Sequence, residues 1–184
     1  MARGKVEPLR REALVEAAIA EVAASGASDV TVAAIARRAG VSAALAHHYF
    51  GSKDRILLAA MRHILTVYGA AVRGALAMAD GPEARLEAIL RASFGPENFR
   101  ADVVAAWLDF YVLARRDEGA GRLLRVYRRR LRSNLVHALR PLVADPWAGA
   151  DSLGALIDGL YLRAALGSDV DPLAVARAHL AGLR

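Results

Sequence analysis

The hydrophobic positions along the chain recur with the three-to-four-residue period of α-helices. In the first predicted helix, Leu14, Ala18 and Val22 lie four residues apart and would share one face. Pro8 suits the first turn of this helix and Gly26 suits its end. No segment alternates hydrophobic and polar residues as a half-buried strand does. The pattern therefore predicts an all-α protein.

Glycine and proline divide the rest of the chain into further helices. Two short helices are predicted from Thr31 to about Ala39 and from Ser42 to about Phe50, each opening at a residue that can cap a helix N-terminus. A longer helix is predicted from residue 52 to about residue 78. The remaining helices are expected at about residues 82–94, 101–115, 118–142, 150–167 and 172–183.

The segment from residue 31 to residue 53 reads TVAAIARRAGVSAALAHHYFGSK. Two short helices joined by residues 39–42 match the helix-turn-helix, in which the first helix braces the second in the major groove of DNA. Ala36 is small enough for the two helices to approach, Gly40 permits a left-handed turn, and Ser42 caps the second helix. An ordinary helical hairpin would not require this spacing of caps. The segment therefore predicts a DNA-binding protein.

The same residues resemble the DNA-binding signature of the TetR family of bacterial repressors. The signature consists of Thr31, Ile35-Ala36, the Ala-Gly-Val-Ser run of residues 39–42, Tyr49-Phe50 and Ser52-Lys53. Residues 106–110, 129–135 and 155–166 resemble the BetI type of the family, choline-responsive repressors of glycine betaine synthesis genes. The resemblance implies an N-terminal three-helix helix-turn-helix DNA-binding domain over residues 1–52. It also implies a larger helical ligand-binding and dimerisation domain over residues 53–184.

The DNA contacts are expected on the second short helix and at the starts of its neighbours. The N-terminal residues of a recognition helix meet base edges, while its flanks meet phosphate. This chain has Ala46 where the family commonly has a large aliphatic residue, so Leu45 either reads DNA or packs in the core. Tyr49 either contacts phosphate or packs. The expected contacts are Thr31, Ser42, Ala43, Ala44, Leu45, His47, His48, Tyr49 and Lys53.

Of the 184 residues, 25 are Lys or Arg and 19 are Asp or Glu, which gives a net charge of +6. Residues 1–60 hold eight basic and six acidic residues, a net of +2, whereas residues 115–140 hold nine and two, a net of +7. The small charge of the DNA-binding part favours two subunits acting together on a palindromic site. The Arg-rich segment is interpreted as the solvated face of a core helix, with an anionic membrane surface or added DNA affinity as alternatives.

The N-terminal segment carries its own basic residues, Arg3, Lys5, Arg10 and Arg11. As a flexible arm they would reach phosphate or the minor groove. The alternative is a solvated terminus.

Aromatic residues in the larger part suggest a ligand cage. Trp107, Phe110 and Tyr111 share a helix face, and further tyrosines lie on the helices expected around it. A quaternary ammonium group is attracted by aromatic faces and needs a carboxylate to balance its charge. The resemblance implies a small-molecule inducer such as choline, while aromatic core packing and a hydrophobic drug-like inducer of efflux genes remain alternatives. The candidate ligand residues are Trp107, Phe110, Tyr111, Tyr127, Asp158 and Tyr161.

The last two predicted helices carry apolar faces that suit a homodimer, because the family uses such a pair for a two-fold four-helix interface. The alternative is that these faces pack inside one subunit. The expected interface residues are Leu153, Leu156, Ile157, Leu160, Ala164, Leu173, Ala176 and Leu180.

Several other classes of function are disfavoured. The chain has no cysteine, and the adjacent His47 and His48 point about 100° apart on a helix, so we expect no metal and no cofactor. Asp109, His137 and Asp158 lie on separate helices without a nucleophile motif, which argues against an enzyme. No stretch approaches the ~18 apolar residues of a membrane span. We therefore expect a cytoplasmic protein that does not act at a membrane.

Overall fold

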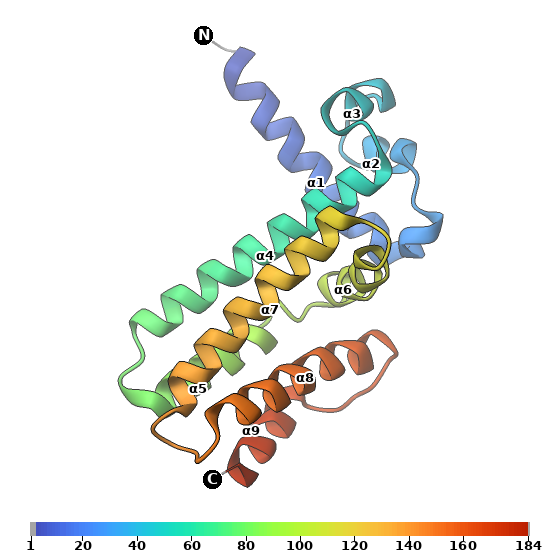
Figure 1. Ribbon diagram of the computed structural model, residues 1–184. Coiled ribbons are helices and arrows are strands. Elements are labelled where there is room, and N and C mark those ends of the chain that lie inside the picture. The colour runs from blue at the N-terminus through green and yellow to red at the C-terminus, as the bar shows by residue number, and fades with distance from the viewer. Residues whose placement is uncertain (1–2, 184) are drawn as a thin grey trace. The chain divides into compact units, whose positions relative to one another are not determined.

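The computed structural model describes residues 3–183, with side chains except those of residues 3–5, 27 and 28. These residues form nine α-helices and no strand (Figure 1), so the all-α prediction is confirmed. The helices are α1 (Arg3–Asp29), α2 (Val32–Arg38), α3 (Ala43–Phe50), α4 (Lys53–Ala77), α5 (Gly81–Phe94), α6 (Ala101–Ala114), α7 (Glu118–Leu139), α8 (Pro146–Ala165) and α9 (Pro172–Gly182).

Two helix starts differ from the prediction. α1 begins at Arg3, so Pro8 lies inside the helix and cannot donate an N–H to the carbonyl of residue 4. α8 begins at Pro146, about four residues early, because the Asp145 carboxylate accepts from the N–H groups of Trp147 and Ala148 at 3.0 Å each. The break in α1 at Gly26 was predicted, and its φ of 74° ends the regular helix there.

The chain folds into two compact units that alternate along the sequence. The first contains the residues up to 64 together with 101–121, and the second contains residues 65–100 and those from 122 onward. α4 contributes residues to both. The packing units differ from the expected division at residue 52 because α6 packs on α1 and so joins the first unit.

The first unit has a continuous hydrophobic core. Leu14 and Ile19 of α1, Ile35 of α2, Ile56 of α4 and Phe110 of α6 are its largest fully buried side chains. The helix-turn-helix is thus fixed to the rest of its unit by α1, which contacts both α2 and α6.

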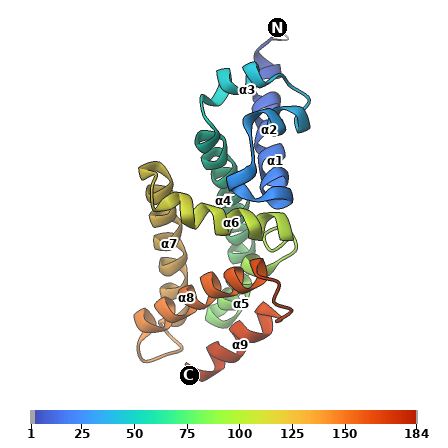
Figure 2. The same ribbon diagram turned by 90° about the vertical axis from the view of Figure 1, so that its right-hand side faces the viewer.

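In the second unit α8 and α9 lie side by side (Figure 2) and α9 also contacts α5. Its core is formed by apolar side chains of α5, α7, α8 and α9. The fully buried members are Leu86, Ile89, Leu90, Leu135, Ala138, Leu139, Ala150, Leu153, Ile157 and Ala176.

A buried polar cluster crosses this second core. The Tyr161 hydroxyl of α8 donates to the carbonyl oxygens of Ser93, at 2.6 Å, and Asn98, at 3.0 Å. The Asn98 amide donates to the carbonyl of Ala92 at 2.9 Å, and the Tyr68 hydroxyl lies 3.1 Å from the Ser93 hydroxyl. Burial raises the pKa of both tyrosines. The cluster ties α8 and α4 to the end of α5.

By length and composition, α4 could cross a membrane, although Arg62 and Arg73 lie within it. The sequence expectation that no segment reaches this threshold was therefore too strict. Ile56, Ala60 and Ile64 of the same helix are buried in the protein, and a core helix meets the same criteria.

Removal of the Tyr161 hydroxyl should destabilise the protein. In Tyr161→Phe the carbonyls of Ser93 and Asn98 lose their buried donor, so we expect the free energy of unfolding to fall by about 1–3 kcal/mol. Urea denaturation at a fixed protein concentration measures the change. Tyr49→Phe is the matched control, because no described residue forms a hydrogen bond with the Tyr49 hydroxyl. Equal effects of the two substitutions would contradict the role of the cluster.

Candidate nucleic-acid interface

The turn between α2 and α3 has the predicted geometry. Gly40 adopts a φ of 68°, and the Val41 N–H donates to the carbonyl of Ala36 at 3.0 Å. The Thr31 hydroxyl accepts from the Ala34 N–H at 3.1 Å. The Ser42 hydroxyl accepts from the Leu45 N–H at the same distance. Both short helices therefore have the caps that the sequence predicts.

α3 has one side in the core and one side in solvent. Ala46 is 0% exposed, as expected for the core position of the helix. Ala43, Ala44, His47 and His48 are exposed, and Leu45 is half-buried. The exposed side therefore offers two methyl groups and two imidazoles, which suit thymine methyls, base edges and phosphates.

The orientation of His47 limits what its ring can read. Its Nδ1 atom lies 3.3 Å from the carbonyl oxygen of Gly51. Because a carbonyl only accepts, Nδ1 carries the hydrogen in this contact, which leaves Nε2 of the neutral ring as an acceptor. An acceptor matches the exocyclic amino groups of adenine and cytosine in the major groove.

Arg11 of α1 packs against the aromatic end of α3. Its guanidinium carbon lies 5.1 Å from the ring centroid of Tyr49 and 5.3 Å from that of Phe50, both within cation–π range. This contact favours the packing alternative for Tyr49. It also places Arg11, one of the four residues of the expected basic arm, against α3. The side chains of Arg3 and Lys5 lie outside the described residues.

The other expected DNA contacts lie at helix starts. Thr31 and Ser42 are exposed, and both cap helices with their hydroxyls. Lys53 is half-exposed in the first turn of α4. Exposed helix N-termini favour phosphate, so these positions stay candidates for backbone contacts.

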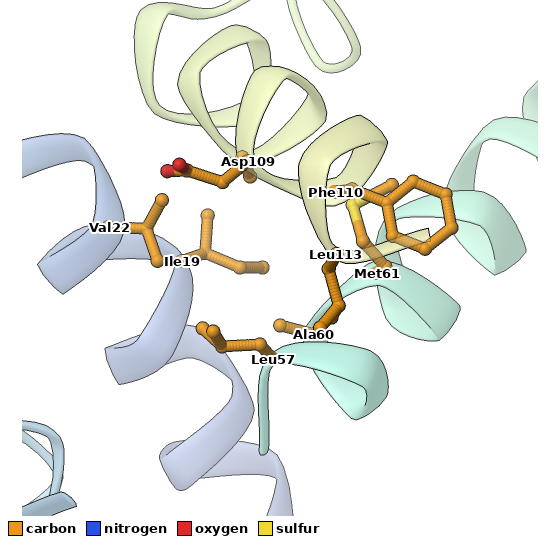
Figure 3. Close-up of a pocket in the computed structure, with 9 residues that line it drawn as sticks. Ile19, Val22, Leu57, Ala60, Met61, Asp109, Phe110 and Leu113 are labelled. Carbon is orange, nitrogen blue, oxygen red and sulfur yellow. The ribbon is translucent and has the colours of Figure 1, made fainter. Parts of the chain in front are cut away.

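The α6 part of the expected ligand cage belongs to the first unit. The Trp107 ring lies 5.8 Å from Phe110 and 5.5 Å from Tyr111, so the three aromatics do form a cluster. Phe110 is 2% exposed and lines a cavity of about 20 Å³ with side chains of α1 and α4, and Asp109 lies at its edge (Figure 3). That volume suits about one water molecule, not a quaternary ammonium ion.

The other cage residues belong to the second unit and line different spaces. Tyr127 lines a groove between α4 and α7. Asp158 lines a hollow between α7 and α8, where its carboxylate pairs with Arg128 at 3.1 Å. Tyr161 is buried in the polar cluster. Residues three apart on a helix point about 60° apart, which is enough to separate Asp158 from Tyr161.

The groove between α4 and α7 contains residues that the sequence did not suggest as ligand contacts. Arg73 and Arg130 line it together with Tyr68 and Tyr127. Of these four residues only Tyr127 was among the predicted ligand contacts, because the lining comes from two helices far apart in the chain.

Most of the expected dimer residues lie inside the subunit. Leu153, Ile157, Leu160, Ala176 and Leu180 are buried in the core of the second unit, which is the alternative that the sequence left open. Leu156, Ala164 and Leu173 are half-buried. The large exposed apolar residues of α8 are Trp147 and Leu162, and Leu166, the C-cap residue that follows the helix, is 73% exposed. Because α8 carries apolar residues on more than one side, the sequence pattern alone does not decide which of them face a partner.

Part of the positive charge of α7 is compensated by α8. Arg128 pairs with Asp158, and the Arg132 guanidinium Nη2 lies 2.8 Å from Asp151. The hydrogen bond from Arg132 lowers the pKa of Asp151. Arg132 also stacks on Trp147, 4.7 Å from the ring centroid. These arginines connect two helices, so they are more than a solvated face.

The capped turn and the two-sided α3 define a helix-turn-helix DNA-binding protein. Residues 14–60 match the bacterial regulatory proteins of the tetR family, and residues 82–183 match the C-terminal domain of BetI-type transcriptional repressors. The chain belongs to the TetR family and has the C-terminal domain of a BetI-type repressor. It is therefore a transcriptional regulator and not an enzyme.

Similar proteins agree with this assignment. A relative from Brucella suis, the HTH-type transcriptional regulator BetI, is 50% identical over 93% of this chain and 87% of its own length. A putative transcriptional regulator from Pseudomonas aeruginosa PAO1 has a solved structure with a TM-score of 0.77 and 32% identity, covering 94% of this chain and 89% of its own. A putative regulator from Saccharomonospora viridis, solved in complex with choline, shares the fold with a TM-score of 0.79 and 23% identity, covering 94% and 93%.

Substitution of Gly40 should weaken both folding and DNA binding. Gly40→Ala forces a side chain into the left-handed region, so we expect the free energy of unfolding to fall by about 1–2 kcal/mol. Gly74→Ala is the control, because Gly74 lies within α4 and no atom lies near the position of an added Cβ. This variant should be more stable than the wild type by about 0.5–1 kcal/mol. Chemical denaturation measures the free energy of unfolding of both variants. A stable Gly40→Ala variant with unchanged DNA affinity would contradict the importance of this turn.

Proposed function

We propose that the protein is a homodimeric repressor that binds a palindromic operator through α3 and releases it when a small molecule binds. The observation that carries this proposal is the exposed side of α3, with Ala43, Ala44, His47 and His48 in solvent while Ala46 is buried. A helix presented in this way can enter the major groove. The protein would act in the cytoplasm, where it meets its operator.

Each part of the surface has a distinct role in this proposal. Ala43 and Ala44 contact thymine methyls, and His47 accepts from a base amino group. Thr31, Ser42 and Lys53 lie at helix starts and contact phosphate, which positions the protein without reading the sequence. His48 contacts the DNA backbone at the edge of the groove, while Tyr49 packs against Arg11 and supports α3.

A dimer is favoured by the low charge of residues 1–60, the DNA-binding part of one subunit, which we call its reading head. Residues 1–60 hold eight basic and six acidic residues, so a single head neutralises few phosphates. Two heads on a two-fold axis double the contacts and match a palindrome. We place the dimer contacts at the exposed positions of α8 and α9, including Leu162 and Leu166, in place of the buried positions named from the sequence.

Release of the operator on ligand binding would act through α4, which has residues in both units. A ligand in the second unit would favour a conformation in which the first turns of α4 shift and the two heads no longer match their half-sites. Choline is the leading inducer, supported by the BetI-type C-terminal domain and by the choline-bound neighbour of the same fold. A hydrophobic drug-like molecule is the second candidate, supported by the apolar residues of the α4–α7 groove.

Operator binding with and without choline tests the inducer. Genome fragments selected by the purified protein supply the operator, and fluorescence anisotropy measures its affinity. If choline is the inducer, saturating choline should weaken operator binding by about tenfold or more, the scale of a usual allosteric coupling. Glycine betaine and tetramethylammonium at the same concentration serve as controls for the chemical group. Undiminished affinity at saturating choline would exclude choline and leave DNA binding intact.

His47 and Lys53 should respond differently to substitution. His47→Ala removes a base acceptor, so the preferred base at one position of each half-site should relax while binding to random DNA changes little. Lys53→Ala should weaken binding to all sequences alike and reduce the slope of log affinity against log salt by about one per phosphate contact. Binding to a library of single-base operator variants separates the two patterns.

An equal loss of affinity of His47→Ala for operator and for random DNA would refute the proposal that His47 recognises a base.

A further inference from the structure

The second unit contains an open groove of about 410 Å³ between α4 and α7, within the size range of small-molecule sites. Leu65, Val72, Leu123, Val126 and Leu131 supply its apolar lining. Its polar lining consists of Ser133 and Asn134 of α7, two tyrosines and two arginines.

Two tyrosines form the aromatic wall of the groove. The rings of Tyr68 and Tyr127 meet edge to face, with centroids 5.8 Å apart. The Tyr68 hydroxyl is engaged with the Ser93 hydroxyl at 3.1 Å, so Tyr68 offers the groove mainly its ring. Burial raises the pKa of Tyr68, which keeps the phenol neutral at physiological pH. The wall is therefore aromatic and uncharged.

The ionisable residues that line the groove are basic. Arg73 and Arg130 belong to its lining, which contains no Asp or Glu. Both arginines are exposed, and within residues 3–183 the structure gives neither an ion pair. Arg73 is turned toward the groove side of α4: its Nη1 atom would lie 3.3 Å from a Cβ added at Gly69, another lining residue. The glycine thus makes room for the guanidinium.

Two arginines without a neighbouring carboxylate favour a ligand of negative charge. A quaternary ammonium ion in the groove would meet two cations and no counter-ion, although it would find aromatic rings. A carboxylate would find two guanidinium groups, which bind planar anions with paired hydrogen bonds. The neighbouring Arg128 and Arg132 differ, because Asp158 and Asp151 compensate them in a separate hollow on the α8 side.

The geometry points to the α4–α7 groove as a binding site for an organic carboxylate with an apolar body. Arg73 and Arg130 hold the carboxylate, and the Tyr68–Tyr127 wall with its leucines and valines covers the apolar part. This inference rests on the proposed function in one respect only: in a ligand-responsive repressor, a carboxylate bound here would be a second effector, opposite in charge to choline. Binding itself is independent of DNA and of the dimer.

Calorimetry with three probes of equal chain length tests the site: octanoate, octyltrimethylammonium and 1-octanol. We expect the full-length protein to bind octanoate about tenfold or more tightly than the ammonium compound, because the two guanidinium groups attract the carboxylate and repel the ammonium group. Arg73→Gln and Arg130→Gln should each weaken octanoate binding about fivefold and leave octanol binding unchanged. Arg129→Gln, an exposed α7 residue outside the groove lining, is the matched control and should bind octanoate like the wild type.

Thermal melts of all variants show whether each remains folded, and surface substitutions of this kind should leave Tm nearly unchanged. Absence of octanoate binding by the wild type, tighter binding of octyltrimethylammonium, or equal losses for Arg129→Gln and the two groove variants would overturn the site. None of these results affects operator recognition or its response to choline, which are measured separately with DNA. Conversely, octanoate binding that depends on both arginines supports the site even where choline fails to release the operator.

Discussion

The DNA-binding surface depends on one backbone constraint, the left-handed conformation of Gly40 between α2 and α3. That conformation lets the chain reverse in a few residues, so that Ser42 can cap α3 and Ala46 can reach the core. The alanines and histidines of α3 are in solvent as a consequence, because they lie on the opposite side of the same short helix. A single glycine therefore determines both how α3 packs and which of its residues are exposed for the proposed DNA contacts.

The distribution of charge separates the two functions of the molecule. The reading head has a small net charge, and in the proposed function it depends on capped helix starts and on duplication in a dimer. Most of the excess charge lies on α7, where two arginines are neutralised by α8 and Arg130 lines a groove. Net charge alone would have assigned DNA binding to α7. The partners of each arginine, and not the number of arginines, distinguish those that link two helices from Arg130, which we propose as a ligand contact.

The sequence predicts what depends on local chemistry and misses what depends on neighbours distant in the chain. The caps at Thr31 and Ser42 and the turn at Gly40 need only a few adjacent residues, so the helix-turn-helix was found with its correct bounds. The buried side of α8 could not be identified, because that helix carries apolar residues on more than one side and only tertiary contacts show that Leu153 and Ile157 are internal. The groove was missed for the same reason, since Arg73 and Arg130 are 57 positions apart in the sequence and meet one space only after folding.

The helix caps differ in charge between the two parts of the molecule. The caps of α2 and α3 are neutral hydroxyl groups, whereas those of α8 and α9 are the carboxylates of Asp145 and Asp171, each of which accepts from two backbone N–H groups. A neutral cap leaves the partial positive charge of a helix N-terminus available to an approaching anion. A carboxylate cap already supplies a negative charge there and would repel a phosphate. The starts of α8 and α9 are therefore closed to anions, while those of α2 and α3 stay open to them.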